Sequence, residues 1–269
     1  MSQLFTFFEF YTPVPSNDRF QLHFHEDYEI YLFLEGDTRY VIEENVYSLE
    51  PGDIIIIQKN QMHRAYHNSP EKYHRMVLNV SPDFFTVASC PEYESIFLQD
   101  RRQYSKITAE TVRSSGLYDA FLRAKKYSQD FKNPYTPVIR SIVTEILYLI
   151  NHIENYSFSD ISNPRLKEII SYLNEHFTEP ISLDALAEKF YLSKYHLCHI
   201  FSEGTGLTVY KYITNKRLTR ADELIRSGFS INDAALAAGF NHYMSYYRAR
   251  KRNSEIVKLS FMPVEIGKM

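Results

Sequence analysis

The feature that most constrains this chain is a pattern of two short helices around a tight turn, which occurs twice in the C-terminal part. The first copy spans residues 182–201 and the second spans residues 230–248. Each copy has a helix rich in small residues, a turn, and a second helix rich in polar and aromatic side chains. Small residues let the following helix cross at close range, as a helix-turn-helix requires. This part of the chain is therefore predicted to be all-α.

Capping residues mark the expected helix starts in both copies. Ser182 and Ser193 precede the two helices of the first copy, and Ser230 forms a capping box with Asp233 in the second. Between the copies, residues 209–227 have apolar side chains at helical spacing. A helix of about 18 residues is about 27 Å long, and successive major grooves on one face of B-DNA are about 34 Å apart. The second helices of the two copies are therefore predicted to enter successive grooves.

The charge distribution divides the chain in the same place. Residues 1–163 contain 15 Lys and Arg against 22 Asp and Glu, whereas residues 164–269 contain 15 against 11. An acidic half followed by a basic half suits a sensor joined to a nucleic-acid binder. No apolar run is long enough to span a bilayer, no export signal is visible, and Cys90 and Cys198 have no metal-binding spacing. We expect a cytoplasmic protein with reduced thiols and no membrane partner.

The rest of the chain predicts an α+β fold. Short strands and turns between residues 5 and 80 indicate a sandwich or small barrel. Beyond residue 110 the period becomes helical, with a heptad-like seam that either packs on the barrel or forms a dimer interface. The seam comprises Ile139, Ile142, Ile146, Leu149 and Ile153. The expected domains are a sensor at 1–105, a helical connector and dimerisation segment at 106–163 (with a linker at 156–163), and a DNA-binding domain at 164–269.

The C-terminal pattern resembles the AraC/XylS (arabinose-regulator type) family of transcription factors between about Leu166 and Arg248. The matching features are Ser-Leu-x-x-Leu-Ala at 182–187, Ser193 to Leu197, Phe201, Thr205-Gly206, Arg217-Leu218, Ala221, Leu224, Ile231 and Ala238 to Phe240. The resemblance implies a homodimeric regulator, not an enzyme, that binds double-stranded promoter DNA and contacts RNA polymerase. We expect an activator, although neither the sign of regulation nor the operator is encoded in a motif.

The resemblance also implies which side chains face the bases. The matching positions are Tyr195, Cys198 and His199 in the first copy, and Tyr243, Met244, Tyr247 and Arg248 in the second. Arg248 can donate a bidentate pair to guanine, and Cys198 or Met244 can contact a thymine methyl. Phosphate contacts are expected from five further cations. They are Lys194, Lys216, Arg217, Arg220 and Lys251.

The chain departs from the family pattern after Arg248. The family usually has an aromatic residue two positions further on, followed by a Gly-x-x-Pro element. Here Arg250 and Glu255 occupy the aromatic and glycine positions. This departure predicts a poorly packed last helix, and it supports an alternative function as a regulator with impaired DNA binding.

The N-terminal half contains a motif that resembles a cupin barrel, the usual sensor domain of this family. The motif comprises His23-x-His25, Glu29, Gly36, Pro51-Gly52-Asp53 and His63. The expected effector pocket contains His23, His25, Glu29, Tyr31 and His63. Three imidazoles and a carboxylate can hold Fe, Mn, Ni or Zn, so three interpretations stay open: a divalent transition-metal site, a polar lining for a small-molecule effector, and a structural hydrogen-bond cluster. A metal-dependent cupin enzyme is the alternative function.

Overall fold

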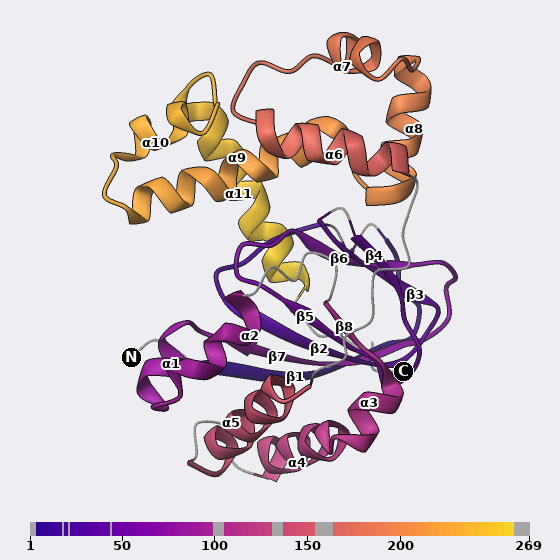
Figure 1. Cartoon of the computed structure of the whole chain (residues 1–269), viewed down its shortest axis with the longest axis vertical. Helices are drawn as coiled ribbons and strands as arrows, with labels where there is room; N and C mark the ends of the chain where they lie inside the picture. The colour runs from indigo at the N-terminus through magenta and orange to yellow at the C-terminus, as the bar shows by residue number, and fades with distance from the viewer. Residues whose placement is uncertain are drawn as a thin grey trace, which may run out of the picture.

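The computed structural model describes residues 4–17, 19–20, 22–43, 45–98, 105–130, 137–153 and 164–260, without the side chains of 129–130 and 255–260. A body built on β-strands contains the N-terminal half, and helices after residue 164 form a second body against it (Figure 1). The expected linker at 156–163 lies outside the described residues. In the described part of the chain, no helix is both long and apolar enough to cross a membrane.

Two antiparallel sheets face each other in the N-terminal body, which we call the barrel. The larger has the order β1 (Phe5–Thr12), β7 (Tyr73–Val80), β2 (Tyr28–Glu35), β5 (Ile54–Ile57) and β8 (Lys106–Ile107). The smaller has the order β4 (Asn45–Ser48), β3 (Thr38–Ile42) and β6 (His63–His67). Alternation along β2 places Ile30 and Leu32 in the core under the helices, and Tyr31 and Phe33 between the sheets. This explains why β2 is apolar on both faces.

Helices cover the outer face of the larger sheet. They are α1 (Asp83–Val87), η1 (Pro91–Glu94), α2 (Ser95–Leu98), α3 (Ala109–Ser114), α4 (Leu117–Asp130) and α5 (Pro137–Asn151). The heptad-like seam of α5 packs against α4 and the sheet, in the same core as Ile30 and Leu78. The structure therefore favours the interpretation of a helix packed on its own barrel, because Ile139, Ile142 and Ile146 are buried there and Leu149 and Ile153 are partly buried.

The expected boundary between residues 105 and 106 is wrong. β8 pairs with β5 through Ile107 and Lys106 opposite Ile54 and Ile55. Val112, on α3, is fully buried in the same core as the larger sheet. Residues 105–130 and 137–153 therefore belong to the barrel body and do not form a separate connector.

The C-terminal body is all-α, as predicted. Its helices are α6 (Pro164–His176), α7 (Leu183–Lys189), α8 (Lys194–Thr205), α9 (Val209–Arg226), α10 (Ile231–Ala237) and α11 (Tyr243–Ser260). The side chains of Ser182, Ser193 and Ser230 accept the expected capping hydrogen bonds from backbone N–H groups. α9 runs through all 18 of its residues without a break, so it joins the two helix-turn-helix units as one rigid spacer.

The last helix contacts α9 at the position where it departs from the family pattern. α11 continues to Ser260, and Arg250 forms an ion pair with the buried carboxylate of Asp222 on α9. The hydroxyl of Tyr246 donates to the same carboxylate over 3.4 Å. The aromatic residue expected at position 250 is thus replaced by a cation with an acidic partner. Among the described side chains of α11 after Arg248, Asn253 is the one that is buried, so the prediction of a poorly packed helix end stays a prediction.

Candidate DNA-binding surface and barrel cavity

The two recognition helices, α8 and α11, expose matching pairs of aromatic rings. Tyr195 and His199 lie one turn apart on α8 with parallel rings 6.1 Å apart. Tyr243 and Tyr247 lie one turn apart on α11, also with 6.1 Å between ring centres. All four side chains are exposed, Tyr195 to 81%. The two helix-turn-helix units can be aligned on their N-cap residues, Ser182 and Ser230. In this alignment Tyr195 corresponds to Tyr243, and His199 corresponds to Tyr247.

The same alignment separates exposed positions from core positions. Cys198 is half-buried against the core and corresponds to the buried Tyr246, so the structure gives it less access to bases than the resemblance implies. His196 is exposed and corresponds to the exposed Met244. His196 was therefore missed as a candidate base contact, although aligning the two copies of the motif finds it. Arg248 is exposed, and its Nε donates to the carbonyl of Met244.

The five expected phosphate contacts fall into two groups. Lys194, Arg220 and Lys251 are exposed, and the first two form surface ion pairs with Asp184 and Glu223 over 2.7 and 3.2 Å. Exposed pairs of this kind contribute little stability and can exchange for a phosphate. The remaining two, Lys216 and Arg217, are half-buried.

Lys216 and Arg217 are engaged inside the protein. Arg217 donates to the backbone carbonyls of Phe177 and Glu179 over 2.6 and 2.8 Å, which ties α9 to the end of α6. Lys216 lies 3.5 Å from the carboxylate of Glu43 in the barrel. Both side chains therefore have partners within the protein, and their expected phosphate contacts stay predictions.

A basic cleft of about 530 Å³ lies between α9 and α11. Its lining includes four cations, Lys211, Arg217, Arg248 and Arg252, and no acidic side chain. Leu22 of the barrel forms part of its wall. A groove lined by one sign of charge concentrates the opposite charge, so the cleft beside Arg248 suits a nucleic-acid backbone.

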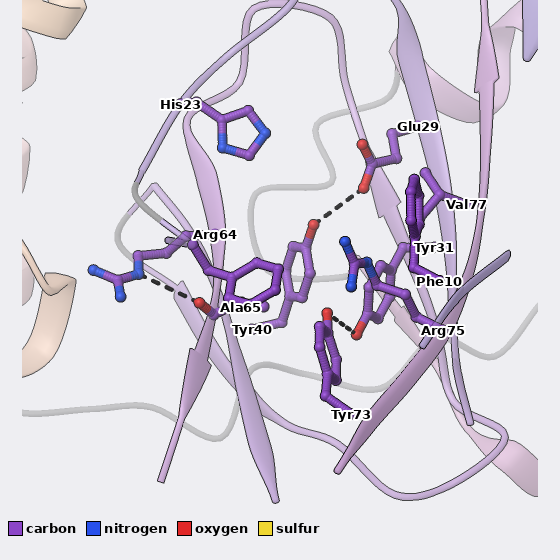
Figure 2. A pocket seen from close by; sticks show the side chains of 11 residues that line it. Phe10, His23, Glu29, Tyr31, Tyr40, Arg64, Ala65, Tyr73, Arg75 and Val77 are labelled. Carbon is purple, nitrogen blue, oxygen red and sulfur yellow. Dashed lines mark hydrogen bonds between the residues drawn. The ribbon is translucent and has the colours of Figure 1, made fainter. Parts of the chain in front are cut away.

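The barrel interior is almost filled by aromatic side chains (Figure 2). The remaining cavity is about 30 Å³, which is the size of a water molecule rather than an organic effector. Tyr31 and Tyr73 share a hydrogen bond of 2.7 Å, and the Tyr40 hydroxyl donates to Glu29 over 3.1 Å. The guanidinium of Arg75 lies 4.7 Å from the centre of the Tyr73 ring.

The structure places three of the expected pocket residues, His23, Glu29 and Tyr31, around this cavity. The expected set omitted Arg75, which projects inward from β7 together with Tyr73. Residue alternation along β7 could have predicted this, because residues at even spacing share one face of a strand.

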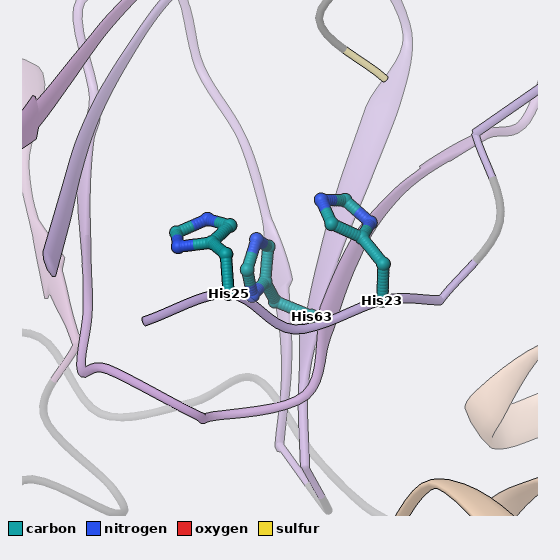
Figure 3. Close-up of side chains that lie close together, drawn as sticks. All are labelled: His23, His25 and His63. Atoms are coloured by element: carbon teal, nitrogen blue, oxygen red, sulfur yellow. The ribbon is translucent and has the colours of Figure 1, made fainter. Parts of the chain in front are cut away.

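The other two expected residues, His25 and His63, join His23 in a histidine cluster at one end of the cavity (Figure 3). One ring nitrogen from each lies within 4.8 Å of those of the others. Oε2 of Glu29 is 3.1 Å from Nε2 of His25 and 3.7 Å from Nε2 of His63. The structure thus brings the three histidines together and places Glu29 beside His25 and His63.

Electrostatics distinguishes the members of the cluster. Burial alone would raise the pKa of Glu29, but the hydrogen bond with His25 and the nearby imidazoles lower it to about 2. Burial opposes protonation of His25, yet the same hydrogen bond raises its pKa. Burial lowers the pKa of His63 to about 4. Near neutral pH the site therefore contains a carboxylate, the imidazole of His25 bound to it, and a neutral His63.

The barrel is docked against the DNA-binding domain by polar and apolar contacts. Nη1 of Arg64 donates to the carbonyl of Gly206 over 3.1 Å, and the hydroxyl of Tyr212 donates to Glu43 over 3.3 Å. Arg226 forms an ion pair of 3.3 Å with Glu26. Four apolar barrel residues share one core with α6, α8 and α9. They are Leu22, Phe24, Val41 and Met62.

Two family models match the chain. One described as an AraC-like ligand binding domain matches residues 8–123, and one described as a helix-turn-helix domain matches residues 186–256. The HTH-type transcriptional regulator YbfI of Bacillus subtilis (strain 168) is 26% identical over 227 residues, covering 83% of this chain and 80% of YbfI. The HTH-type transcriptional activator RhaS of Escherichia coli O81 (strain ED1a) is 25% identical over 240 residues, covering 85% and 84%.

Among solved structures, ToxT from Vibrio cholerae O395 aligns with 96% of this chain and 99% of its own, at 14% identity and a TM-score of 0.42. The matched domains and the two capped helix-turn-helix units define a DNA-binding transcription regulator with an N-terminal ligand-binding domain. The chain belongs to the AraC family of such regulators.

Proposed function

We propose that this regulator reads promoter DNA with α8 and α11 in successive major grooves, while the docked barrel controls how the two helices are presented. The observation that carries the proposal is the pair of matching aromatic faces, Tyr195 with His199 and Tyr243 with Tyr247, on two capped helices joined by the unbroken α9. A spacer about 27 Å long, with its turns, suits the groove repeat of about 34 Å.

Docking of the barrel on the DNA-binding domain offers a way to control DNA binding. Glu43 of the barrel holds Lys216, which would otherwise be available to a phosphate. Leu22 of the barrel also borders the cleft that contains Arg248. A ligand shifts such an equilibrium only if it binds the docked and undocked arrangements with different affinity.

The barrel is the proposed effector site. Its cavity of about 30 Å³ is too small for an organic effector, so binding requires movement of rings such as Tyr40 and Tyr73. That movement would reach the docking surface through Arg64, which lines the cavity and donates to Gly206. A small-molecule effector acting in this way fits a regulator better than the alternative of a metal-dependent cupin enzyme, because Glu29, His23 and the rings around them are closed off from substrate.

We further propose that the protein acts in the cytoplasm as a homodimer that activates transcription by contacting RNA polymerase. RhaS, whose name describes an activator, aligns with most of both domains. The seam of α5 packs against the sheet of its own barrel, so we place the dimer surface elsewhere. Sedimentation of the full chain at several concentrations tests the dimer, and two-hybrid capture of polymerase subunits tests the second contact.

Arg248→Ala tests the DNA-binding proposal directly. An operator would first be selected from random duplexes with the full-length protein. Loss of a bidentate contact to guanine should then weaken discrimination at one base pair by about 1–3 kcal/mol. Fluorescence anisotropy across a set of single-base operator variants measures it.

The matched control is Arg165→Ala, which removes an exposed arginine from α6 of the same domain. It should leave sequence preference unchanged. Wild-type preference in the Arg248→Ala protein would remove Arg248 from the base contacts, and failure to select any operator would contradict the proposed function itself.

A further inference from the structure

The cleft between α9 and α11 has the size of a small-molecule site. Its volume is about 530 Å³, and small-molecule sites in proteins measure about 300–1,000 Å³. Residues of α9 and α11 form most of the lining, and Leu22 of the barrel adds to it. α11 extends from the second helix-turn-helix unit toward the barrel (Figure 1). The cleft therefore lies where the barrel meets the DNA-binding domain.

Cations line this cleft, and none of the lining residues is acidic. Lys211 and Arg252 are exposed and have no ion-pair partner among the described residues. Arg217 is held by its hydrogen bonds to the carbonyls of Phe177 and Glu179, so its guanidinium is ordered before a ligand arrives. Cations without acidic partners attract an anion, and arginine suits phosphate because its donors lie in one plane. The cleft therefore favours a phosphate group.

A buried amide sets a second requirement on the ligand. Asn253 of α11 is 8% exposed and lines the cleft. Its Oδ1 is buried and has no hydrogen-bond partner among the described residues. Buried polar atoms are nearly always paired, so this oxygen indicates a missing donor. A phosphate dianion offers only acceptors, so the donor must be another group of the same ligand, such as a hydroxyl.

The buried part of the cleft suits a small molecule better than a DNA duplex. Leu207 and Phe240 also line the cleft and, like Asn253, are buried. The phosphates of a duplex lie on the outside of a broad rod, which can meet the exposed cations but cannot enter a cleft to reach buried side chains. A small ligand can contact the cations and the buried amide together.

We propose that this cleft binds a small phosphate ester that also carries hydroxyl groups, which is the chemistry shared by sugar phosphates and nucleotides. The phosphate contacts Lys211, Arg217 and Arg252, and a hydroxyl donates to Asn253. Tyr210, which lines the cleft and is 75% exposed, offers a ring on which the base of a nucleotide can stack. The site shares no lining residue with the barrel cavity.

Occupancy of the cleft opposes DNA binding. Arg248 lines the cleft and is also the proposed guanine contact, so the ligand and the operator compete for the same guanidinium. Linkage then requires that operator DNA lower the affinity for the ligand by the same factor. This competition rests on the proposed function, whereas binding of the ligand does not.

Phosphorus NMR of the full-length protein tests the site without DNA, with ribose 5-phosphate and AMP as separate probes. The phosphate signal of each should broaden and shift, and adenosine, which has no phosphate, should not displace ribose 5-phosphate. Lys211→Gln/Arg252→Gln should weaken binding of both probes by about tenfold or more. The matched control is Arg165→Gln/Lys189→Gln, which removes two exposed cations of the same domain outside the cleft. It should bind as the wild type does.

Two comparisons define the ligand more closely. Asn253→Ala should weaken binding of ribose 5-phosphate and leave unchanged that of methyl phosphate, which has no hydroxyl at pH 8. Tighter binding of AMP than of ribose 5-phosphate, lost in Tyr210→Ala, identifies the nucleotide as the ligand class. Equal affinities identify the sugar phosphate.

Absence of any change in the signals of both probes overturns the site. Wild-type affinity in a folded Lys211→Gln/Arg252→Gln protein also overturns it. If that variant weakens only the binding of a selected operator, the cleft is a duplex surface and the proposal is wrong. Ribose 5-phosphate that binds without releasing operator DNA in fluorescence anisotropy overturns the competition, and failure to select any operator concerns the proposed function alone.

Discussion

At the scale of single residues, the ion pair between Arg250 and Asp222 shows how one substitution can be absorbed by another. The carboxylate of Asp222 is 4% exposed, whereas the Arg250 side chain is 43% exposed. A buried carboxylate that loses its cation stays in a poor solvent, which destabilises the fold. The aromatic residue usual in the family at position 250 would have this effect here.

Arg250→Leu is therefore expected to lower the free energy of unfolding by about 1–3 kcal/mol, less than the roughly 3–5 kcal/mol for a fully buried pair, because Arg250 is partly solvated. The double variant Asp222→Leu/Arg250→Leu should recover most of the loss, because no buried charge remains. Urea unfolding of the four proteins completes the cycle. Equal stability of wild type and Arg250→Leu would show that the ion pair does not support α11.

His67 provides a pH-dependent contribution to barrel stability. Burial, together with the positive charges of Arg75 and Arg64, lowers its pKa to about 3 against the opposing charge of Asp37. An unfolded histidine titrates at about 6.5. Between these values the unfolded chain binds the proton and the folded chain does not, so the stability is present above about pH 6.5 and is lost as the pH falls toward 3.

Between pH 7 and pH 5.5, the free energy of unfolding of the wild type should therefore fall by about 1 kcal/mol more than that of His67→Gln. Urea unfolding at both pH values measures the difference. The control is His152→Gln, which removes an exposed histidine of the same body. Its free energy of unfolding should change between the two pH values as that of the wild type does. A His67→Gln protein with the wild-type slope would mean that the buried imidazole titrates normally.

At the scale of elements, the two helix-turn-helix turns reach the same backbone shape with different residues. Tyr191 has φ of 52° in the first turn, and Gly239 has φ of 94° in the second. A Cβ at Gly239 would lie 2.5 Å from the carbonyl oxygen of Thr178. The second turn thus requires glycine for space as well as for its dihedral angle, whereas the first leaves room for an exposed tyrosine.

Gly239→Ala should destabilise the DNA-binding domain by about 1–3 kcal/mol more than Gly228→Ala. Gly228 is the matched control, because its φ is 97° and no atom lies within 4 Å of its added Cβ. Thermal unfolding followed by circular dichroism compares them. Equal losses would show that the cost comes from the dihedral angle alone and not from contact with Thr178.

Sequence patterns predicted these elements well where the cause is local. The serine caps at 182, 193 and 230 and the continuous α9 depend on side chains within one turn of each other. The seam of α5 shows the limit. Its spacing predicts an apolar face, but a dimer partner and the protein's own sheet could each bury such a face. Only the fold shows that the sheet does so.

At the scale of the whole molecule, the docked barrel connects the proposed effector site to the DNA-binding helices. Glu43 joins the barrel to α9 through Tyr212 and Lys216.

Glu43→Lys should repel Lys216 and shift the molecule toward undocked forms, which increases the radius of gyration measured by small-angle scattering. Glu35→Lys is the matched reversal, since Glu35 forms an ion pair with Lys72 on the barrel surface. An unchanged radius in Glu43→Lys would show that apolar docking dominates.

The sequence alone determined the α+β class, the two DNA-reading units and the histidines of the barrel. Caps, turns and strand alternation act between near neighbours, which the order of residues records. Tertiary structure decided the rest: that β8 and α5 complete the barrel, that Arg250 pairs with Asp222, and that Lys216 and Arg217 pair with groups of the protein itself. These contacts join residues distant in the chain, and their partners are chosen by packing and charge in three dimensions.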